Sequence, residues 1–226
     1  MFETRTGNTL SSESSEATDL YQEAVDLILG SESGASETLD KALQLDKDFA
    51  VAAAARYYVA KDVGEPDAEI YRELAEQASQ NATDWERQHI NVLIGMIDQP
   101  DATRAKALAY IETTPADLLV ISQIAGNLLF YGGPNKLDAV LNVLESVEEA
   151  LDNDWAFLVR LGFAASEAGH RMRGRELIEW ALDIRPQALY SIHALAHMLH
   201  DDGAAEESAK LLQDWLEVHG SGAREG

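Results

Sequence analysis

The chain has 226 residues, of which 17 are basic and 40 acidic, and its formal net charge is −23 at pH 7. This length allows a sizeable core, but a strongly acidic surface repels phosphate backbones and anionic lipids. We therefore expect no nucleic-acid partner and no membrane partner, whereas peptides and small molecules of cationic or neutral character remain open. The lack of cysteine excludes disulfides, thiolate nucleophiles and cysteine-based metal sites.

Residues 1–17 are rich in Ser, Glu and Thr and contain few apolar side chains. Such a segment buries too little apolar surface to offset the entropy of ordering, so we predict a disordered acidic and Ser-rich tail. The first residues lack the pattern of a secretion signal, and no later run is long and apolar enough to cross a bilayer. A cytoplasmic location is the resulting expectation.

From Asp19 onward, apolar side chains recur at helical spacing, and no segment shows the sustained alternation of a strand. The segment Thr83–Glu86 has the pattern of a capping box, which places the start of one helix. Helices are predicted at residues 19–29, 39–45, 49–58, 68–79, 84–97, 100–111, 115–131, 137–151, 155–168, 173–184, 190–202 and 204–218.

The last two predicted helix pairs repeat each other. Leu161 and Gly169 are each followed, 34 residues further on, by Leu195 and Gly203, and this is the period of a tetratricopeptide-type helix pair. The sequence thus predicts an all-α, tetratricopeptide-like α-solenoid of antiparallel helix hairpins, with about 12 helices and degenerate repeats. We expect a single domain over residues 18–219 and a flexible tail at 220–226.

In the register of such an array, a polar stripe faces the concave groove. His193, His197 and His200 lie on one face of their predicted helix, which also carries Tyr190, and the remaining candidates come from two other predicted helices. The predicted ligand-binding residues are Gln123, Asn127, Phe163, Glu167, Tyr190, His193, His197 and His200.

Six segments stand out together: Asp84–His89, Pro115–Asp117, Gly162–Gly169 and, most specifically, Ser191–Met198 followed by Asp202-Gly203 and Trp215-Leu216. With these segments the chain resembles the tetratricopeptide repeat protein 38-like, or StaR-like, family. The resemblance spans roughly residues 40–218 and covers the N-terminal portion of that family only, because the family continues with a second histidine-rich helix. It implies helical repeats and no defined activity.

His193 and His197 are four residues apart and can bind one metal ion from adjacent helical turns. Ala194 occupies the position of the general-base Glu of HExxH enzymes, which argues against that type of hydrolase. A third ligand would be His200, Glu167 or Asp201. We favour the simpler interpretation, in which the histidines line a polar groove, so no metal or other cofactor is expected.

The favoured function is a non-catalytic binding scaffold that holds a peptide or a small ligand in its groove. The alternative is a metal-binding protein or an enzyme that uses the histidine stripe on a small polar metabolite. A third interpretation is a homodimer through the C-terminal helix face, formed by Leu211, Leu212, Trp215 and Leu216. Trp85 and His89 are interpreted as an interhelix brace.

Overall fold

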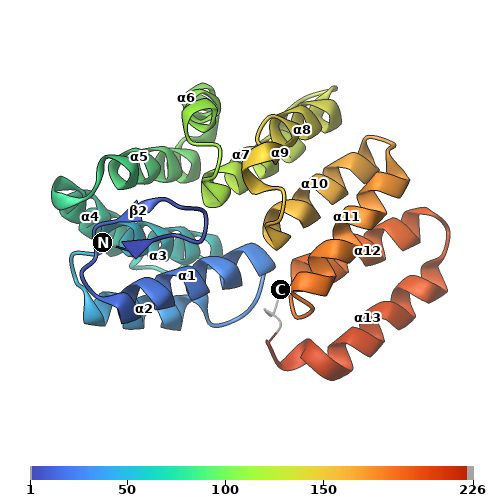
Figure 1. Ribbon diagram of the computed structural model, residues 1–226, viewed down its shortest axis with the longest axis horizontal. Helices are drawn as coiled ribbons and strands as arrows, with labels where there is room; N and C mark the ends of the chain where they lie inside the picture. Colours follow the sequence, from blue (N-terminus) through green and yellow to red (C-terminus); the bar gives the residue numbers. More distant parts are fainter. Residues whose placement is uncertain (1, 223–226) are drawn as a thin grey trace. The chain divides into compact units, whose positions relative to one another are not determined.

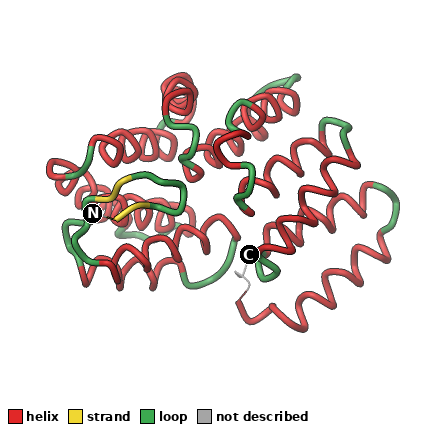
Figure 2. Tube along the Cα trace, viewed as in Figure 1, coloured by secondary structure: helices red, strands yellow, loops and turns green. Residues whose placement is uncertain are grey.

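The computed structural model describes residues 2–222, and most of these residues are α-helical (Figures 1 and 2). They divide into two compact units, where the sequence predicted one domain over residues 18–219. Unit 1 comprises residues 2–28 and 34–124, and unit 2 comprises residues 29–33 and 125–222. In repeat proteins most contacts join neighbouring helices, so an array can divide in this way without any change in its helix pattern.

Two short strands and seven α-helices begin in unit 1, and the boundary between the units falls within α1 and within α7. The elements are β1 Phe2–Glu3, β2 Thr9–Leu10, α1 Ser15–Gly30, α2 Ala35–Leu45, α3 Ala50–Val63, α4 Ala68–Ala78, the 3₁₀ turn η1 Ser79–Asn81, α5 Asp84–Asp98, α6 Pro100–Thr113 and α7 Leu118–Tyr131.

The first 17 residues differ from the predicted disordered tail. Strands β1 and β2 pair in a short antiparallel hairpin, seen in yellow in Figure 2, and the side chain of Leu10 is buried. The Ser11 backbone N–H donates to Glu86 Oε1 (3.0 Å), and the Thr83 hydroxyl donates to the carbonyl of Thr9 (3.2 Å). Polar hydrogen bonds to the start of α5 therefore hold this segment, and a prediction based on apolar content could not see them.

The capping box at Thr83 is confirmed. The Thr83 hydroxyl accepts from the backbone N–H of Glu86 (3.1 Å), while a carboxylate oxygen of Glu86 accepts from the backbone N–H of Thr83 (2.7 Å). Because the other oxygen of the fully buried Glu86 accepts from Ser11, one carboxylate both caps α5 and fixes the hairpin.

Helix α3 is the centre of unit 1, where it packs against α2, α4 and α5. The alanine run of α3 is completely buried, which lets neighbouring helices approach closely. Phe49 precedes this run and Tyr57 follows it, and both side chains are fully buried. The buried Arg56 guanidinium pairs with Asp40 (2.9 Å) and with Glu65 (2.8 Å). These two carboxylates compensate the positive charge of Arg56, which would otherwise be costly to bury.

Six helices begin in unit 2. They are α8 Lys136–Glu145, α9 Glu148–Leu151, α10 Trp155–Glu167, α11 Arg171–Ile184, α12 Leu189–Asp201 and α13 Ala205–His219, followed by the 3₁₀ turn η2 Gly220–Gly222. The sequence predicted one helix over residues 137–151, but the helix breaks near Ser146, whose hydroxyl donates to the carbonyl of Val143 (2.7 Å). The predicted tail at 220–226 begins with η2, and residues 223–226 lie outside the described residues.

Helices α10 and α11 cross at two glycines. A Cβ atom on Gly162 would lie 2.7 Å from the carbonyl oxygen of Gly174, and one on Gly174 would lie 2.6 Å from the carbonyl oxygen of Gly162. The two backbones are thus in direct contact, and α10 and α11 share the most extensive contact among the described helices of unit 2. The two helices run side by side in Figure 1.

The two repeated turns also match the prediction. Gly169 follows α10 with a φ of 95°, and Gly203 follows α12 with a φ of 83°. Only glycine adopts this left-handed conformation without strain, so each turn ends its helix and leads into the next one. The α10–α11 and α12–α13 pairs are therefore successive copies of one hairpin repeat.

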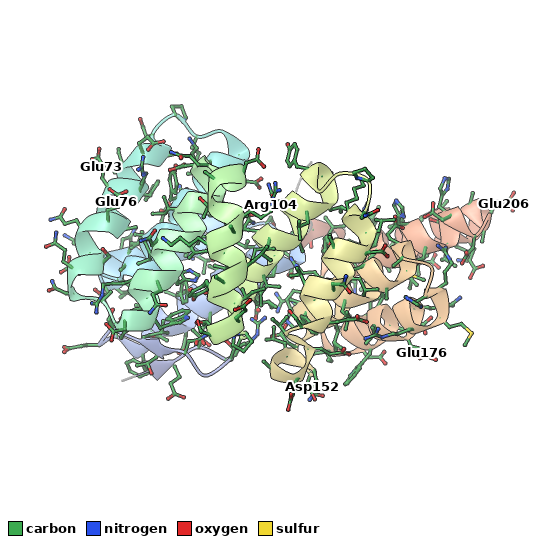
Figure 3. All side chains as sticks on the ribbon, turned by 90° about the horizontal axis from the view of Figure 1, so that it is seen from above. Glu73, Glu76, Arg104, Asp152, Glu176 and Glu206 are labelled. Atoms are coloured by element: carbon green, nitrogen blue, oxygen red, sulfur yellow. The ribbon has the colours of Figure 1, made fainter. Side chains whose placement is uncertain are left out.

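The acidic side chains lie mostly on the outer surfaces of the helices. In Figure 3, Glu73 and Glu76 on α4 and Glu176 on α11 project away from the ribbon, and all three are exposed. Among the described helices, none combines the length and the apolar character that a membrane span requires.

Candidate functional site

Helices α10 and α12 of unit 2 carry most of the predicted ligand-binding residues. The carboxylate of Asp154 caps the start of α10, where it accepts from the backbone N–H groups of Ala156 (2.9 Å) and Phe157 (3.2 Å). Helix α12 packs against both α10 and α11. The side chains at the ends of α10 and α12 are consequently held on two rigid elements that touch each other.

Four of the predicted side chains, together with that of Asp201, meet where α10 and α12 face each other. The ring of Phe163 on α10 stands edge-on to the ring of His197 on α12, with 5.5 Å between centroids, and the ring of His193 is 6.2 Å from that of His197. His197 Nδ1 is 3.1 Å from Asp201 Oδ2 and 3.9 Å from Glu167 Oε1. We call Phe163, Glu167, His193, His197 and Asp201 the α10–α12 face.

The electrostatics of the α10–α12 face favour a neutral His193. Partial burial lowers the pKa of His193, and the neighbouring His197 lowers this pKa further because two adjacent positive charges repel each other. The carboxylates of Glu167 and Asp201 lie nearer to His197. The face therefore combines an acidic end with an aromatic, weakly basic end.

Tyr190 is engaged in a different contact. The guanidinium of Arg160 lies over its ring at 4.8 Å, and the same guanidinium donates to the carbonyls of Ala156 (2.8 Å) and Leu29 (3.1 Å). Tyr190 is half-buried at the start of α12 and Arg160 lies within α10, so this stacking joins the two helices.

The remaining predicted residues are more scattered. His200 is exposed on the last turn of α12, beside the α10–α12 face. Gln123 is half-buried and belongs to unit 1, whereas Asn127 is 8% exposed and belongs to unit 2, although both lie on α7. Helical spacing placed these two residues on one stripe, but packing buries one of them.

One group of side chains has the spacing of a metal site. Glu167, His197 and Asp201 each offer a ligand atom, and these atoms lie within 4.8 Å of one another. The sequence analysis considered His200, Glu167 and Asp201 as the third ligand, and two of these, Glu167 and Asp201, belong to this group. His193 lies outside the group. The side chains of Glu167, His197 and Asp201 are 25%, 43% and 37% exposed, respectively, so water competes for any ion held there.

The predicted homodimer face is altered by the packing of Trp215. This side chain is 7% exposed, and its indole N–H donates to the carbonyl of Pro186 (2.7 Å). Trp215 therefore anchors α13 to the start of the α12 hairpin, and of the predicted face only Leu216, at 52% exposed, is strongly exposed.

Unit 1 contains a buried polar cluster that the sequence did not single out as a site. Asp117 Oδ2 accepts from Tyr110 (2.6 Å) and lies 2.7 Å from His89 Nδ1, while Asp117 Oδ1 accepts from the backbone N–H of Val120 (3.3 Å). Trp85 stacks beside His89 at 5.1 Å. The brace predicted for His89 and Trp85 exists, but its partner Asp117 is 28 residues away, and no local pattern announces it.

Charge and burial act in opposite directions on Asp117. Burial by itself raises the pKa of this carboxyl, but the charge of His89 and the hydrogen bonds from His89, Tyr110 and Val120 outweigh burial, and the pKa is lowered. Burial also raises the pKa of Tyr110, and the charge of Asp117 adds to this rise. Asp117 is thus an ionised acceptor, and Tyr110 is a protonated donor.

The helix hairpins and their glycine turns define an all-α, tetratricopeptide-like solenoid fold. No family model and no curated protein matches the chain. Two solved structures are similar in fold: the human IFIT1 dimer with PPP-AAAA, at 16% identity and a TM-score of 0.54, and the human IFIT1 dimer with m7Gppp-AAAA, at 15% identity and a TM-score of 0.54. Each similarity covers 88% of this chain, which spans about half the length of the solved IFIT1 chains (49% and 50%).

These structures correct one expectation from the sequence. The net charge of −23 led us to exclude nucleic acid as a partner, but both IFIT1 structures of this fold are complexes with RNA. Net charge describes the average surface, whereas binding depends on the charges and hydrogen-bond donors of one face, so the exclusion of nucleic acid was wrong.

Proposed function

We propose that the chain is a non-catalytic, tetratricopeptide-like binding scaffold whose ligand occupies the α10–α12 face. The observation that carries this proposal is the convergence of Phe163, Glu167, His197 and Asp201, from two helices, on one partly exposed surface. Helical repeat arrays present such rigid, side-chain-lined surfaces to extended ligands.

The ligand is a peptide or a small molecule with a cationic group. Two carboxylates, of Glu167 and Asp201, lie beside the ring of Phe163, and an ammonium or guanidinium group is attracted both by carboxylates and by the face of an aromatic ring. The net charge of −23 would also speed the approach of a cation.

The other predicted residues have different relations to this surface. His193 supplies a neutral ring that can donate or accept a hydrogen bond, and His200 lies one turn beyond His197 on α12. Tyr190 positions the start of α12 through Arg160. Gln123 and Asn127 remain proposed contacts from α7.

Calorimetric titration with a short oligolysine peptide tests this proposal, and Glu167→Gln is the informative variant. We expect binding by the unmodified protein, with an affinity that falls as salt rises, and about three- to tenfold weaker binding by Glu167→Gln. Glu176→Gln is the matched control because it removes the same charge from an exposed position on α11 of the same unit. Equal losses in both variants would show that only net charge matters and would contradict the proposal.

An RNA oligonucleotide with a 5′-triphosphate is the second probe in this titration. Because the similar IFIT1 structures are RNA complexes, saturable binding of this probe without binding of oligolysine would make RNA the ligand in place of the cationic peptide. Its dependence on salt would then count the phosphate contacts.

The second candidate function is metal binding, or an enzyme that uses the metal on a small polar metabolite. It is favoured by the spacing of Glu167, His197 and Asp201, one imidazole and two carboxylates, which suits a divalent cation. Metal content after mild dialysis tests it: near-stoichiometric metal that is lost in His197→Ala but kept in His193→Ala would support this candidate. Traces of metal that are equal in all three proteins would count against it.

Two further expectations remain proposals. Membership of the tetratricopeptide repeat protein 38-like family is supported by the segments Gly162–Gly169 and Ser191–Met198, whose helices form successive hairpins. A cytoplasmic location is supported only by sequence patterns. Fluorescence microscopy of the tagged protein in its native cells would test the location.

A further inference from the structure

A small cavity lies in unit 1, beside the buried cluster of His89 and Asp117. Its walls come from the β1–β2 loop, α1, α5 and the start of α7, and its volume is about 40 Å³. This volume holds roughly three water molecules. The cavity is far from the residues of the α10–α12 face in sequence and belongs to the other unit, so a ligand bound there would be independent of the proposed function.

Two buried polar atoms belong to residues that line this cavity and have no hydrogen-bond partner among the described residues: His89 Nε2 and Trp85 Nε1. His89 is 1% exposed, and among the described residues its Nε2 atom makes no hydrogen bond. Buried polar groups in folded proteins are nearly always hydrogen-bonded, because the loss of water is otherwise not compensated. His89 also lines the cavity, so Nε2 has space beside it for a partner.

The hydrogen bonds of Asp117 determine the chemistry of that atom. An ionised carboxylate only accepts, and Asp117 already accepts from Tyr110 and from the backbone of Val120. The 2.7 Å contact between Asp117 Oδ2 and His89 Nδ1 therefore requires the proton on Nδ1. When the ring is neutral, Nε2 is an acceptor, and the partner that it then needs is a donor.

The rest of the cavity wall includes Arg5, whose guanidinium pairs with Asp26, together with uncharged polar groups and apolar groups. Thr4, Thr6 and Asn8 of the β1–β2 loop supply hydroxyls and an amide, whereas Val25, Leu118 and Leu119 supply aliphatic surface. The loop is well fixed: the hydroxyls of Thr4 and Thr6 are 3.1 Å apart, and Asn8 donates from its backbone to Thr4 (3.0 Å) and from its amide to Thr6 (3.3 Å).

We propose that this cavity binds a small alcohol or diol of about three or four heavy atoms, whose hydroxyl donates to His89 Nε2 and whose carbon atoms contact the aliphatic wall. A second hydroxyl, in a diol, faces the threonine hydroxyls of the loop. Water also donates hydrogen bonds, but aliphatic surface favours carbon over water, and a cation would lose its hydration in so small a space. Tyr21 closes the cavity from α1.

Nitrogen-detected NMR of histidine-labelled full-length protein tests this proposal, with ethylene glycol as the probe. We expect the Nδ1-protonated tautomer of His89 and a saturable shift of its Nε2 resonance, with a dissociation constant on the order of millimolar for so small a ligand. The variant His89→Gln assigns the resonance. Absence of any saturable shift would overturn the proposal.

A cavity-filling variant keeps the test decisive even if His89→Gln unfolds. Ala116→Val adds two carbon atoms at a residue that lines the cavity and leaves the His89–Asp117 pair in place. We expect at least tenfold weaker binding of ethylene glycol by Ala116→Val. The control Ala105→Val, at an exposed position on α6, should change the affinity by less than twofold. Equal effects of the two variants would contradict the proposed location.

Two further outcomes would also overturn the assignment. If water alone occupies the cavity, contacts between water and the His89 ring will persist unchanged at the highest glycol concentration. If acetate shifts the resonance instead, with protonation of both ring nitrogens, the ligand is a small carboxylate and not a hydroxyl compound.

Discussion

The crossing of α10 and α11 gives the sharpest prediction, because two glycines in the same unit have opposite surroundings. Gly162 lies inside α10, where a Cβ atom would meet the carbonyl oxygen of Gly174 at 2.7 Å and Ile178 Cγ1 at 2.8 Å. Gly126 lies inside α7, and nothing is within 4 Å of a Cβ atom added there. Both belong to unit 2.

The two alanine substitutions should therefore change stability in opposite directions. In a helix interior, alanine is more favourable than glycine by about 1 kcal/mol, and this gain is common to both positions. At Gly162 the new methyl group meets the backbone of α11, which cannot rotate away, so overpacking costs about 2–3 kcal/mol. We expect Gly162→Ala to destabilise by about 1–2 kcal/mol and Gly126→Ala to stabilise by up to about 1 kcal/mol.

Urea unfolding followed by far-ultraviolet circular dichroism measures both changes. Each variant is compared with the unmodified protein at the same pH and salt, and the transition of unit 2 is identified as the one that both substitutions shift. If Gly162→Ala were as stable as Gly126→Ala, α10 and α11 would not be in backbone contact, and the reasoning would be refuted.

Three more predictions concern charged groups. Glu32→Gln should destabilise unit 2 by about 2–3 kcal/mol in urea unfolding, because Glu32 is 8% exposed and forms a bidentate ion pair with Arg185 (2.8 and 3.1 Å). An unchanged urea midpoint would show that this ion pair is not formed. The pKa of Asp117 is lowered in the fold, so the ionised carboxylate stabilises the folded protein above the usual value of 3.8, and this stabilisation is lost as pH falls below it. The stability difference between the unmodified protein and Asp117→Asn should therefore shrink between pH 7 and pH 3. A constant difference would argue against an ionised Asp117. Replacing His197 with Asn should raise the pKa of His193 in an NMR titration, since one of the two causes of its lowered pKa disappears; no change would place the two rings further apart than 6.2 Å.

Local features of the fold were predicted well from the sequence. The capping box at Thr83 and the helix ends before Gly169 and Gly203 were predicted correctly because each depends on hydrogen bonds or backbone angles within a few residues. The break near Ser146 and the β1–β2 hairpin were missed. In the hairpin, the stabilising partner of Ser11 is Glu86, 75 residues further along the chain.

The candidate site was only partly visible in the sequence. Helical spacing correctly placed His193 and His197 on one face of α12, and the 34-residue register brought Phe163 and Glu167 opposite them. Spacing places Asp201 one helical turn from His197, but it could not show that Glu167 on α10 would lie nearer to His197 than to His193. That choice depends on side-chain rotamers set by packing.

Sequence by itself thus determined the helices, their ends and the repeated hairpins, because these follow from hydrogen bonds and apolar periodicity along a single segment. Only the tertiary structure decided which distant polar groups meet. Asp117 joins His89 and Tyr110, and Trp215 turns inward to Pro186, through contacts between helices. Such contacts arise when packing removes water from polar groups and obliges them to find partners, and no pattern within one helix records that requirement.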